Sequence, residues 1–242
     1  MNGTRASRIV WHEDADESAW ITHAAAAIAD ALRASLAESH RVRLLLSGGS
    51  TPEPVHRALA EAALDWSRVV VGLVDDRDVD PDDAGSNARL VRETFLIGRA
   101  AAAHFDELRP RAQTPDVAVA QANARWREQT SIPIAAVVLG MGDDGHTASL
   151  FPGAADLERA LASREPYFAF DAKGCVGAGI YPRRITLTPL GLAESKQRFL
   201  LLRGGNKRDI FRRALEGGDV RELPIRTAID LSGAPLQVYW CP

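Results

Sequence analysis

His146 lies among glycines and aspartates directly after an apolar run, in the stretch VVLGMGDDGHTASLFPG that covers residues 137–153. Histidine is the side chain that ordinarily titrates near neutral pH, so beside a carboxylate it is suited to act as a general base. Asp144, two residues earlier, is close enough to orient the imidazole or to stabilise its charged form. The apolar run predicts a strand, and the glycines predict a tight turn that presents His146 at the carboxyl end of that strand.

A second glycine-rich segment, LLLSGGSTP, joins another apolar run to a helical pattern. At such a junction, unpaired backbone N–H groups lie at the positive end of the helix dipole, which favours phosphate binding. Gly48 and Gly49 let an anion approach closely, and Ser50 and Thr51 add hydroxyl donors. Lys207, in GGNKRDIF, again follows a strand and glycines near the start of a helix. We therefore expect the Gly-Gly segment and the segment that carries Lys207 to contribute to phosphate binding.

Acidic and basic side chains follow a third apolar run, in GLVDDRDVDPDDAGSN. Asp75 and Asp76 come where this run ends, at the edge where open α/β sheets bind ligands. Arg77 either clamps a phosphate or carboxylate with two hydrogen bonds or neutralises Asp75. If the three apolar runs are parallel strands of one sheet, the loops after them converge on one cleft.

Apolar runs alternate with helical patterns along the whole chain, as in proteins with a parallel sheet covered by helices. The predicted strands are SRIVWH, RVRLLLS, RVVVGLVD, IAAVVLG, RITLT, RFLLLR and LQVYW. Helices are predicted over residues 13–40, 52–64, 116–128 and 206–216, with another that Ser86 or Asn87 caps and that runs to Leu96. We expect a three-layer, Rossmann-like α/β fold with a mostly parallel central sheet and helices on both faces, as a single domain over residues 1–242.

Charge and cysteine content argue against several classes of function. The 29 basic and 32 acidic side chains give a net charge of -3 without a long run of either sign, so nucleic acid is not an expected partner. Cys175 and Cys241 do not have the spacing of a disulfide framework, and no histidines or cysteines have metal-ligand spacing, so we expect no metal. No apolar run approaches the ~20 residues that span a bilayer, and the N-terminus has no signal-peptide core. We expect a cytoplasmic protein without membrane partners.

The chain offers no obvious nucleophile for covalent catalysis. It has no Gly-x-Ser-x-Gly segment, and neither cysteine lies in the three loops. A water molecule activated by His146 is therefore favoured over a covalent intermediate.

Five segments, taken together and in order, resemble the 6-phosphogluconolactonase family of the oxidative pentose phosphate pathway. They are LSGGSTP, VDDR followed by GSN, LGMGDDGHTASLFPG, RRITLTP and GGNK, and they are spread over most of the chain. The resemblance implies a fold of the glucosamine-6-phosphate isomerase and ribose-5-phosphate isomerase type. It also implies hydrolysis of 6-phospho-D-glucono-1,5-lactone to 6-phospho-D-gluconate without a cofactor, by a monomer or weak homodimer.

The resemblance also implies roles for particular residues. His146 looks like the general base with Asp144 as its neighbour, and Asp75 and Arg77 look like groups that face the substrate. The positions expected to hold the phosphate are those of Gly49, Ser50, Thr51, Arg184 and Lys207. The charge that develops on the lactone carbonyl oxygen would be stabilised by Arg77 or by backbone N–H groups.

Two positions depart from the family pattern. Asp76 stands where the family usually has glutamate, and GAGIYPRR lacks the family's lysine, for which Arg183 is expected to substitute.

Two other functions fit parts of the pattern. A glucosamine-6-phosphate deaminase would share the Gly-Gly and Asp-Gly-His segments, but that family has a glutamate where this chain has Phe151. A non-catalytic sugar-phosphate sensor would keep Lys207 and the Gly-Gly loop but would have no need of His146 with Asp144. The presence of that pair favours the enzyme.

Overall fold

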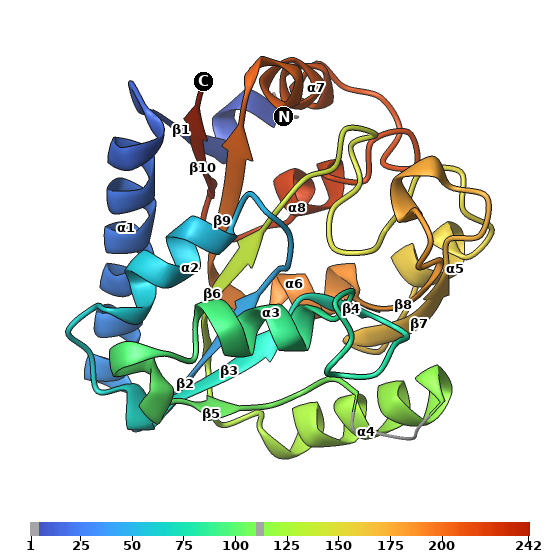
Figure 1. Cartoon of the computed structure of the whole chain (residues 1–242). Helices are drawn as coiled ribbons and strands as arrows, with labels where there is room; N and C mark the ends of the chain where they lie inside the picture. The colour runs from blue at the N-terminus through green and yellow to red at the C-terminus, as the bar shows by residue number, and fades with distance from the viewer. Residues whose placement is uncertain (1–4, 110–113) are drawn as a thin grey trace.

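The computed structural model describes residues 5–109 and 114–242. Within them, a seven-stranded sheet has the order β1-β10-β9-β6-β2-β3-β5, and every neighbouring pair of its strands is parallel (Figure 1). The strands are β1 (Ile9–Glu13), β10 (Leu236–Cys241), β9 (Ser195–Arg203), β6 (Ile134–Leu139), β2 (Val42–Leu46), β3 (Val69–Leu73) and β5 (His104–Phe105). β2, β3 and β6 are buried along their whole length, because helices cover both faces of the sheet.

The helices form two layers around this sheet. Figure 1 shows α1 (Glu17–Glu38) and α2 (Glu53–Ala60) on one side of the strands and α6 (Pro189–Ala193) and α8 (Arg226–Asp230) on the other. α1 packs across β2, β6, β9 and β10, and α3 (Asn87–Thr94) packs on α2. The remaining helices are α4 (Pro115–Glu128), α5 (Leu157–Leu161) and α7 (Gly205–Leu215).

A small antiparallel sheet adjoins the carboxyl end of β3. It has the order β4-β8-β7, made of β4 (Asp75–Arg77), β8 (Arg183–Leu187) and β7 (Tyr167–Asp171). The chain passes from β3 into β4 at Val74, whose N–H donates to Leu46 O (2.9 Å) and whose carbonyl accepts from Leu187 N (2.8 Å). Val74 therefore joins the two sheets at the edge where ligands bind in open α/β folds.

β2 and β6 lie side by side at the point where the order of the sheet reverses. From β2 the chain continues to β3 on one side, and from β6 it leads to β9 on the other. The loops that follow β2 and β6 therefore diverge and leave a crevice between them.

The predicted α/β fold is confirmed, and each predicted strand corresponds to an observed one, although RITLT forms β8 of the small sheet and not a strand of the central sheet. The helix predicted from residue 13 begins at Glu17, because residues up to 13 continue β1 and the Asp16 side chain caps the helix by accepting from Ala19 N (2.9 Å). The short elements β4, β5, β7, α5, α6 and α8 were not predicted.

Candidate active site

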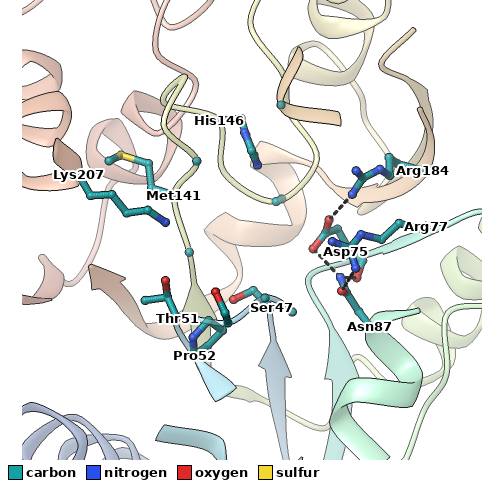
Figure 2. Close-up of a pocket in the computed structure, with 17 residues that line it drawn as sticks. Ser47, Thr51, Pro52, Asp75, Arg77, Asn87, Met141, His146, Arg184 and Lys207 are labelled. Atoms are coloured by element: carbon teal, nitrogen blue, oxygen red, sulfur yellow. Dashed lines mark hydrogen bonds and ion pairs between the residues drawn. The ribbon is translucent and has the colours of Figure 1, made fainter. Parts of the chain in front are cut away.

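A cavity of about 260 Å³ lies at the crevice between the loops after β2 and β6 (Figure 2). Three loops line it, after β2, after β6 and between β7 and β8, together with residues of the small sheet, of α3 and of α7. The lining residues include Gly48, Gly49, Ser50, Thr51, Asp75, Arg77, His146, Arg184 and Lys207. Nine of the ten residues predicted for the site therefore meet around one space, and the tenth, Asp144, contacts His146.

His146 and Asp144 form a close pair at the wall of the cavity. His146 Nδ1 lies 2.5 Å from Asp144 Oδ1, and the same oxygen accepts from His146 N (3.0 Å). Burial acts to raise the pKa of Asp144, but the hydrogen bonds and charge of His146 outweigh it and lower that pKa. Because an ionised carboxylate can only accept hydrogen bonds, Nδ1 carries the proton, and Nε2 is the ring nitrogen that can take another.

An aromatic ring also packs against the imidazole of His146. The ring centroids of His146 and Phe151 are 4.2 Å apart, and Phe151 is fully buried. At the position of Phe151, the deaminase family has a glutamate that supports the histidine. In this protein the histidine packs against an apolar ring instead.

A tight turn after β6 holds His146. Gly142 N donates to His146 O (2.9 Å), and Gly145 N donates to Gly142 O (3.0 Å). A Cβ at Gly142 would lie 2.2 Å from two atoms of the imidazole ring, so only glycine fits there without moving the ring. The predicted role of the glycines in presenting His146 agrees with this geometry.

The loop after β2 and Lys207 of α7 lie on one side of the cavity. In Figure 2, Thr51 and Lys207 lie on that side, Asp75, Arg77 and Asn87 lie on the opposite side, and His146 lies between them. The first turn of α2 follows Thr51 directly, and its N-cap residue, Pro52, makes no side-chain capping bond. Burial lowers the pKa of the Lys207 ammonium. A phosphate would find helix N–H groups and a partly desolvated cation together here.

On the opposite side, Asn87 joins Asp75 to Arg77. Its Nδ2 donates to Asp75 O (2.8 Å) and Asp75 Oδ1 (3.3 Å), and its Oδ1 accepts from Arg77 NH1 (2.7 Å). Arg77 NH1 also donates to Gly85 O (2.8 Å), whereas its Nε is buried and has no hydrogen-bond partner among the described residues. Asn87 thus holds the Asp75 carboxylate next to the Arg77 guanidinium. In the described part of the chain, these two groups do not form a direct ion pair.

Arg184 adds positive charge to the same side of the cavity. Its Nε donates to Tyr181 O (2.6 Å), its NH2 donates to Ala178 O (3.0 Å), and its NH1 lies 3.9 Å from Asp75 Oδ2. Burial lowers the pKa of this guanidinium, although Asp75 acts to raise it. Arg184 therefore also anchors the loop between β7 and β8, whose Gly177 lies against Asp144.

Asp76 does not line the cavity but organises the start of α3. Its carboxylate accepts from the backbone N–H groups of Arg77 (2.8 Å), Asn87 (2.7 Å) and Ala88 (3.2 Å). Burial raises the pKa of Asp76 to about 6, against the effect of these hydrogen bonds. The shorter acid at this position is thus bonded directly to the helix that carries Asn87.

Among the polar side chains that line the cavity, sequence reasoning missed Asn87, and it misjudged Arg183. Asn87 was expected only as an alternative helix cap, but Ser86 is the N-cap, and Asn87 lines the cavity. Its signal was its place in the GSN segment after the acidic loop. The substitution of Arg183 for the missing family lysine is wrong, because the Arg183 side chain is 62% exposed, pairs with Asp78 (3.3 Å) and does not line the cavity.

The part of the chain that the structure describes holds neither a metal-binding cluster nor a membrane-spanning helix. Over residues 5–109 and 114–242, no three His, Cys, Asp or Glu side chains are grouped so that they could hold a metal ion. No helix in the same part of the chain has the length and apolar character needed to cross a membrane.

Comparisons with known proteins agree on one family. The family model described as glucosamine-6-phosphate isomerases/6-phosphogluconolactonase matches residues 15–240. A 6-phosphogluconolactonase of Xylella fastidiosa is 46% identical over 226 residues, which are 93% of each chain, and one of Rhizobium meliloti is 40% identical over 90% of this chain and 94% of its own. The crystal structure of a 6-phosphogluconolactonase from Shewanella baltica superimposes with a TM-score of 0.89 at 35% identity, covering 99% of this chain and 100% of that one. A monomeric glucosamine-6-phosphate deaminase shares the fold (TM-score 0.76, 18% identity, 96% of each chain).

Proposed function

Because the chain belongs to the family of glucosamine-6-phosphate isomerases and 6-phosphogluconolactonase, we propose that it hydrolyses 6-phospho-D-glucono-1,5-lactone to 6-phospho-D-gluconate in the oxidative pentose phosphate pathway. The observation that carries the proposal is the pairing of His146 with Asp144 at the wall of a cavity whose other lining charges are mainly cationic. This arrangement suits an anionic substrate that must be attacked by water.

His146 acts as the general base through Nε2. It takes a proton from a water molecule, the resulting hydroxide attacks C1 of the lactone, and the carbonyl electrons move onto oxygen. When the tetrahedral intermediate collapses, the bond between C1 and the ring oxygen breaks, and the imidazolium returns its proton to that oxygen. Asp144 holds the ring and stabilises its charged form throughout.

Arg77 stabilises the developing oxyanion. Its guanidinium is fixed by Gly85 O and Asn87 Oδ1, so it needs no reorganisation when charge appears. Asp75 cannot easily act as a second base, since its two oxygens already accept hydrogen bonds from Asn87 and Ser149. It accepts a hydrogen bond from a ring hydroxyl of the substrate instead.

The phosphate binds on the side of the cavity that Lys207 and the segment Gly48, Gly49, Ser50 and Thr51 share, and Arg184 adds to the attraction from across the space. Anchoring the phosphate there orients the lactone carbon towards His146 and supplies binding energy remote from the reacting bond. The enzyme works in the cytoplasm as a monomer or weak homodimer, without a cofactor.

The direct test is to add the purified protein to freshly generated 6-phosphogluconolactone and to follow the loss of the lactone. We expect hydrolysis well above the spontaneous rate. Release of ammonia from glucosamine 6-phosphate without lactone hydrolysis would identify a deaminase. Tight sugar-phosphate binding with neither reaction would identify a sensor.

His146→Asn tests the mechanism within this assay. Asparagine retains a hydrogen-bonding side chain but cannot take up a proton at neutral pH. We expect kcat to fall by roughly 10²-fold to 10⁴-fold, the usual contribution of a positioned general base, with an unchanged circular dichroism spectrum. Full activity in the asparagine variant would remove His146 from the mechanism.

A further inference from the structure

Ser149 follows His146 by three residues but has no place in the proposed chemistry. Its side chain is completely buried and does not line the cavity. It nevertheless contacts a residue that does, because its hydroxyl donates to Asp75 Oδ2 at 2.5 Å.

Ser149 is bound to the small sheet at two points. While the hydroxyl donates to Asp75, the backbone N–H of Ser149 donates to Thr186 Oγ1 (3.0 Å). Asp75 and Thr186 are directly paired across β4 and β8. The loop that carries His146 is therefore fastened to the same pair of residues through both the backbone and the side chain of Ser149.

The hydroxyl of Ser149 makes the shortest contact with the Asp75 carboxylate. Asn87 Nδ2 lies 3.3 Å from Oδ1, and Arg184 NH1 lies 3.9 Å from Oδ2. Hydrogen bonds to an ionised acceptor are short and strong compared with neutral ones. Without the Ser149 hydroxyl, the long contact with Arg184 would be the one polar contact left to Oδ2 among the described residues, and the carboxylate could rotate.

The backbone just before Ser149 is strained. Ala148 has a φ of 51°, and it is the one non-glycine residue in the left-handed region within residues 5–109 and 114–242. Such strain persists only where surrounding contacts impose it. Here Thr147 Oγ1 donates to Gly140 O (2.9 Å), and Ser149 makes the two bonds to the small sheet. The turn leaves Ala148 at the cavity wall and places Ser149 behind it, against Asp75.

We propose that Ser149 is a positioning residue whose hydroxyl fixes the Asp75 carboxylate in the orientation in which Asp75 accepts a hydrogen bond from a hydroxyl group of the sugar-phosphate substrate. The identity of that substrate rests on the proposed function. The role of Ser149 rests on its contacts with Asp75 and Thr186 and on the strained turn at Ala148.

The test is a double-mutant cycle with Ser149→Ala, Asp75→Ala and the double variant. We expect Ser149→Ala to lower kcat/KM for the lactone by roughly 10-fold to 100-fold, as for a small misplacement of a substrate-binding group. In the Asp75→Ala background the same change should have almost no further effect on kcat/KM, because no carboxylate is left to position. Ser195→Ala is the matched control: it also removes a buried hydroxyl with a 2.7 Å bond, to Leu192 O, but Ser195 does not line the cavity.

Three results would overturn the proposal. The first is that Ser149→Ala has the same kcat/KM as the Ser195→Ala control. The second is that Ser149→Ala lowers kcat/KM as much in the Asp75→Ala background as in the wild type. The third is that Ser149→Cys keeps the wild-type kcat/KM. The cysteine variant fills the same space with only a weak donor, and it replaces Ser149→Ala in the cycle if the alanine variant does not fold. The affinity of the same variants for 6-phosphogluconate, measured by calorimetry, provides a second double-mutant cycle that does not depend on catalysis. If wild-type protein fails to hydrolyse the lactone, the proposed function is wrong, and the binding cycle still decides the role of Ser149.

Discussion

Gly177 lies where the connection between β7 and β8 passes over the Asp144 carboxylate, and its lack of a side chain makes room for the pairing of Asp144 with His146. A Cβ at this position would lie 2.4 Å from Asp144 Oδ2, 3.2 Å from Asp144 Cγ and 3.3 Å from Phe151 Cε1. The φ of Gly177 lies outside the left-handed region, so alanine there brings no backbone strain of its own. We predict that Gly177→Ala impairs catalysis while the protein still folds.

The size of the effect follows from these distances. Ordinary contacts of a Cβ begin at 3.4 Å, so the new methyl group and the Asp144 oxygen have to separate by about 1 Å. Phe151 is fully buried behind the carboxylate, and Asp144 is bound to His146 at 2.5 Å. The carboxylate therefore moves at the expense of its bond to the imidazole. A misplacement of about 1 Å at a catalytic group lowers the rate by up to about 10²-fold, so we expect kcat to fall roughly 10-fold to 100-fold.

The assay compares kcat, KM and thermal stability of Gly177→Ala with those of Gly179→Ala. Gly179 lies in the same connection with no atom within 4 Å of a Cβ, but its φ is 58°. Alanine at Gly179 should lower the melting temperature, because a left-handed residue other than glycine costs about 1 kcal/mol, and should leave kcat unchanged. The two variants should thus show opposite patterns. A wild-type kcat in folded Gly177→Ala would refute the idea that this connection holds Asp144 in place.

Two further predictions concern charge. Lys207→Ala should lower kcat/KM for the phosphorylated lactone by roughly 10-fold to 100-fold, as expected for a lost charged hydrogen bond, and should leave the rate with unphosphorylated gluconolactone unchanged. The control is Lys196→Ala, which removes a surface ion pair with Glu38. Equal losses of kcat/KM with both lactones would contradict phosphate binding by Lys207. His56 is fully buried, neither of its ring nitrogens has a hydrogen-bond partner within residues 5–109 and 114–242, and burial lowers its pKa to about 3. The unfolded chain binds this proton below about pH 6.5 and the folded chain only below about pH 3, so the free energy of unfolding should fall by about 1.4 kcal/mol per pH unit as the pH drops through that window. His56→Leu should remove this component in urea titrations at several pH values, whereas the exposed His40→Gln should not, and parallel curves for wild type and His56→Leu would contradict the assignment.

The central sheet and most of the cavity could be predicted because their signals are local. The runs that form β2, β3 and β6 are continuously apolar, which is typical of strands covered on both faces. Parallel strands bring their carboxyl ends to one edge, so Gly48, Asp75 and His146 could be assigned to the same cleft from their positions after these strands alone.

The contacts that hold the catalytic groups could not be predicted in this way. Ser149 is a single serine between Ala148 and Leu150, with no pattern that indicates its contact with a residue 74 positions earlier. Gly177 lies among other glycines of a loop, and its closeness to Asp144 depends on how that loop folds over the cavity. Such contacts join segments that are distant in sequence, and periodicity carries no information about them.

The small sheet explains why the acidic residues after β3 become part of the cavity wall. A strand that simply ended at Leu73 would leave Asp75 in a solvated loop, where a carboxylate is free to rotate. Instead, the chain continues into β4, and antiparallel pairing with β8 places Asp75 opposite Thr186 and Arg77 opposite Arg184. Two cations and a carboxylate are thereby held on neighbouring strands, and Ser149 fastens Asp75 and Thr186 of these strands to the loop after β6. The parallel sheet brings His146 to the cavity, and the antiparallel sheet fixes the groups that face it.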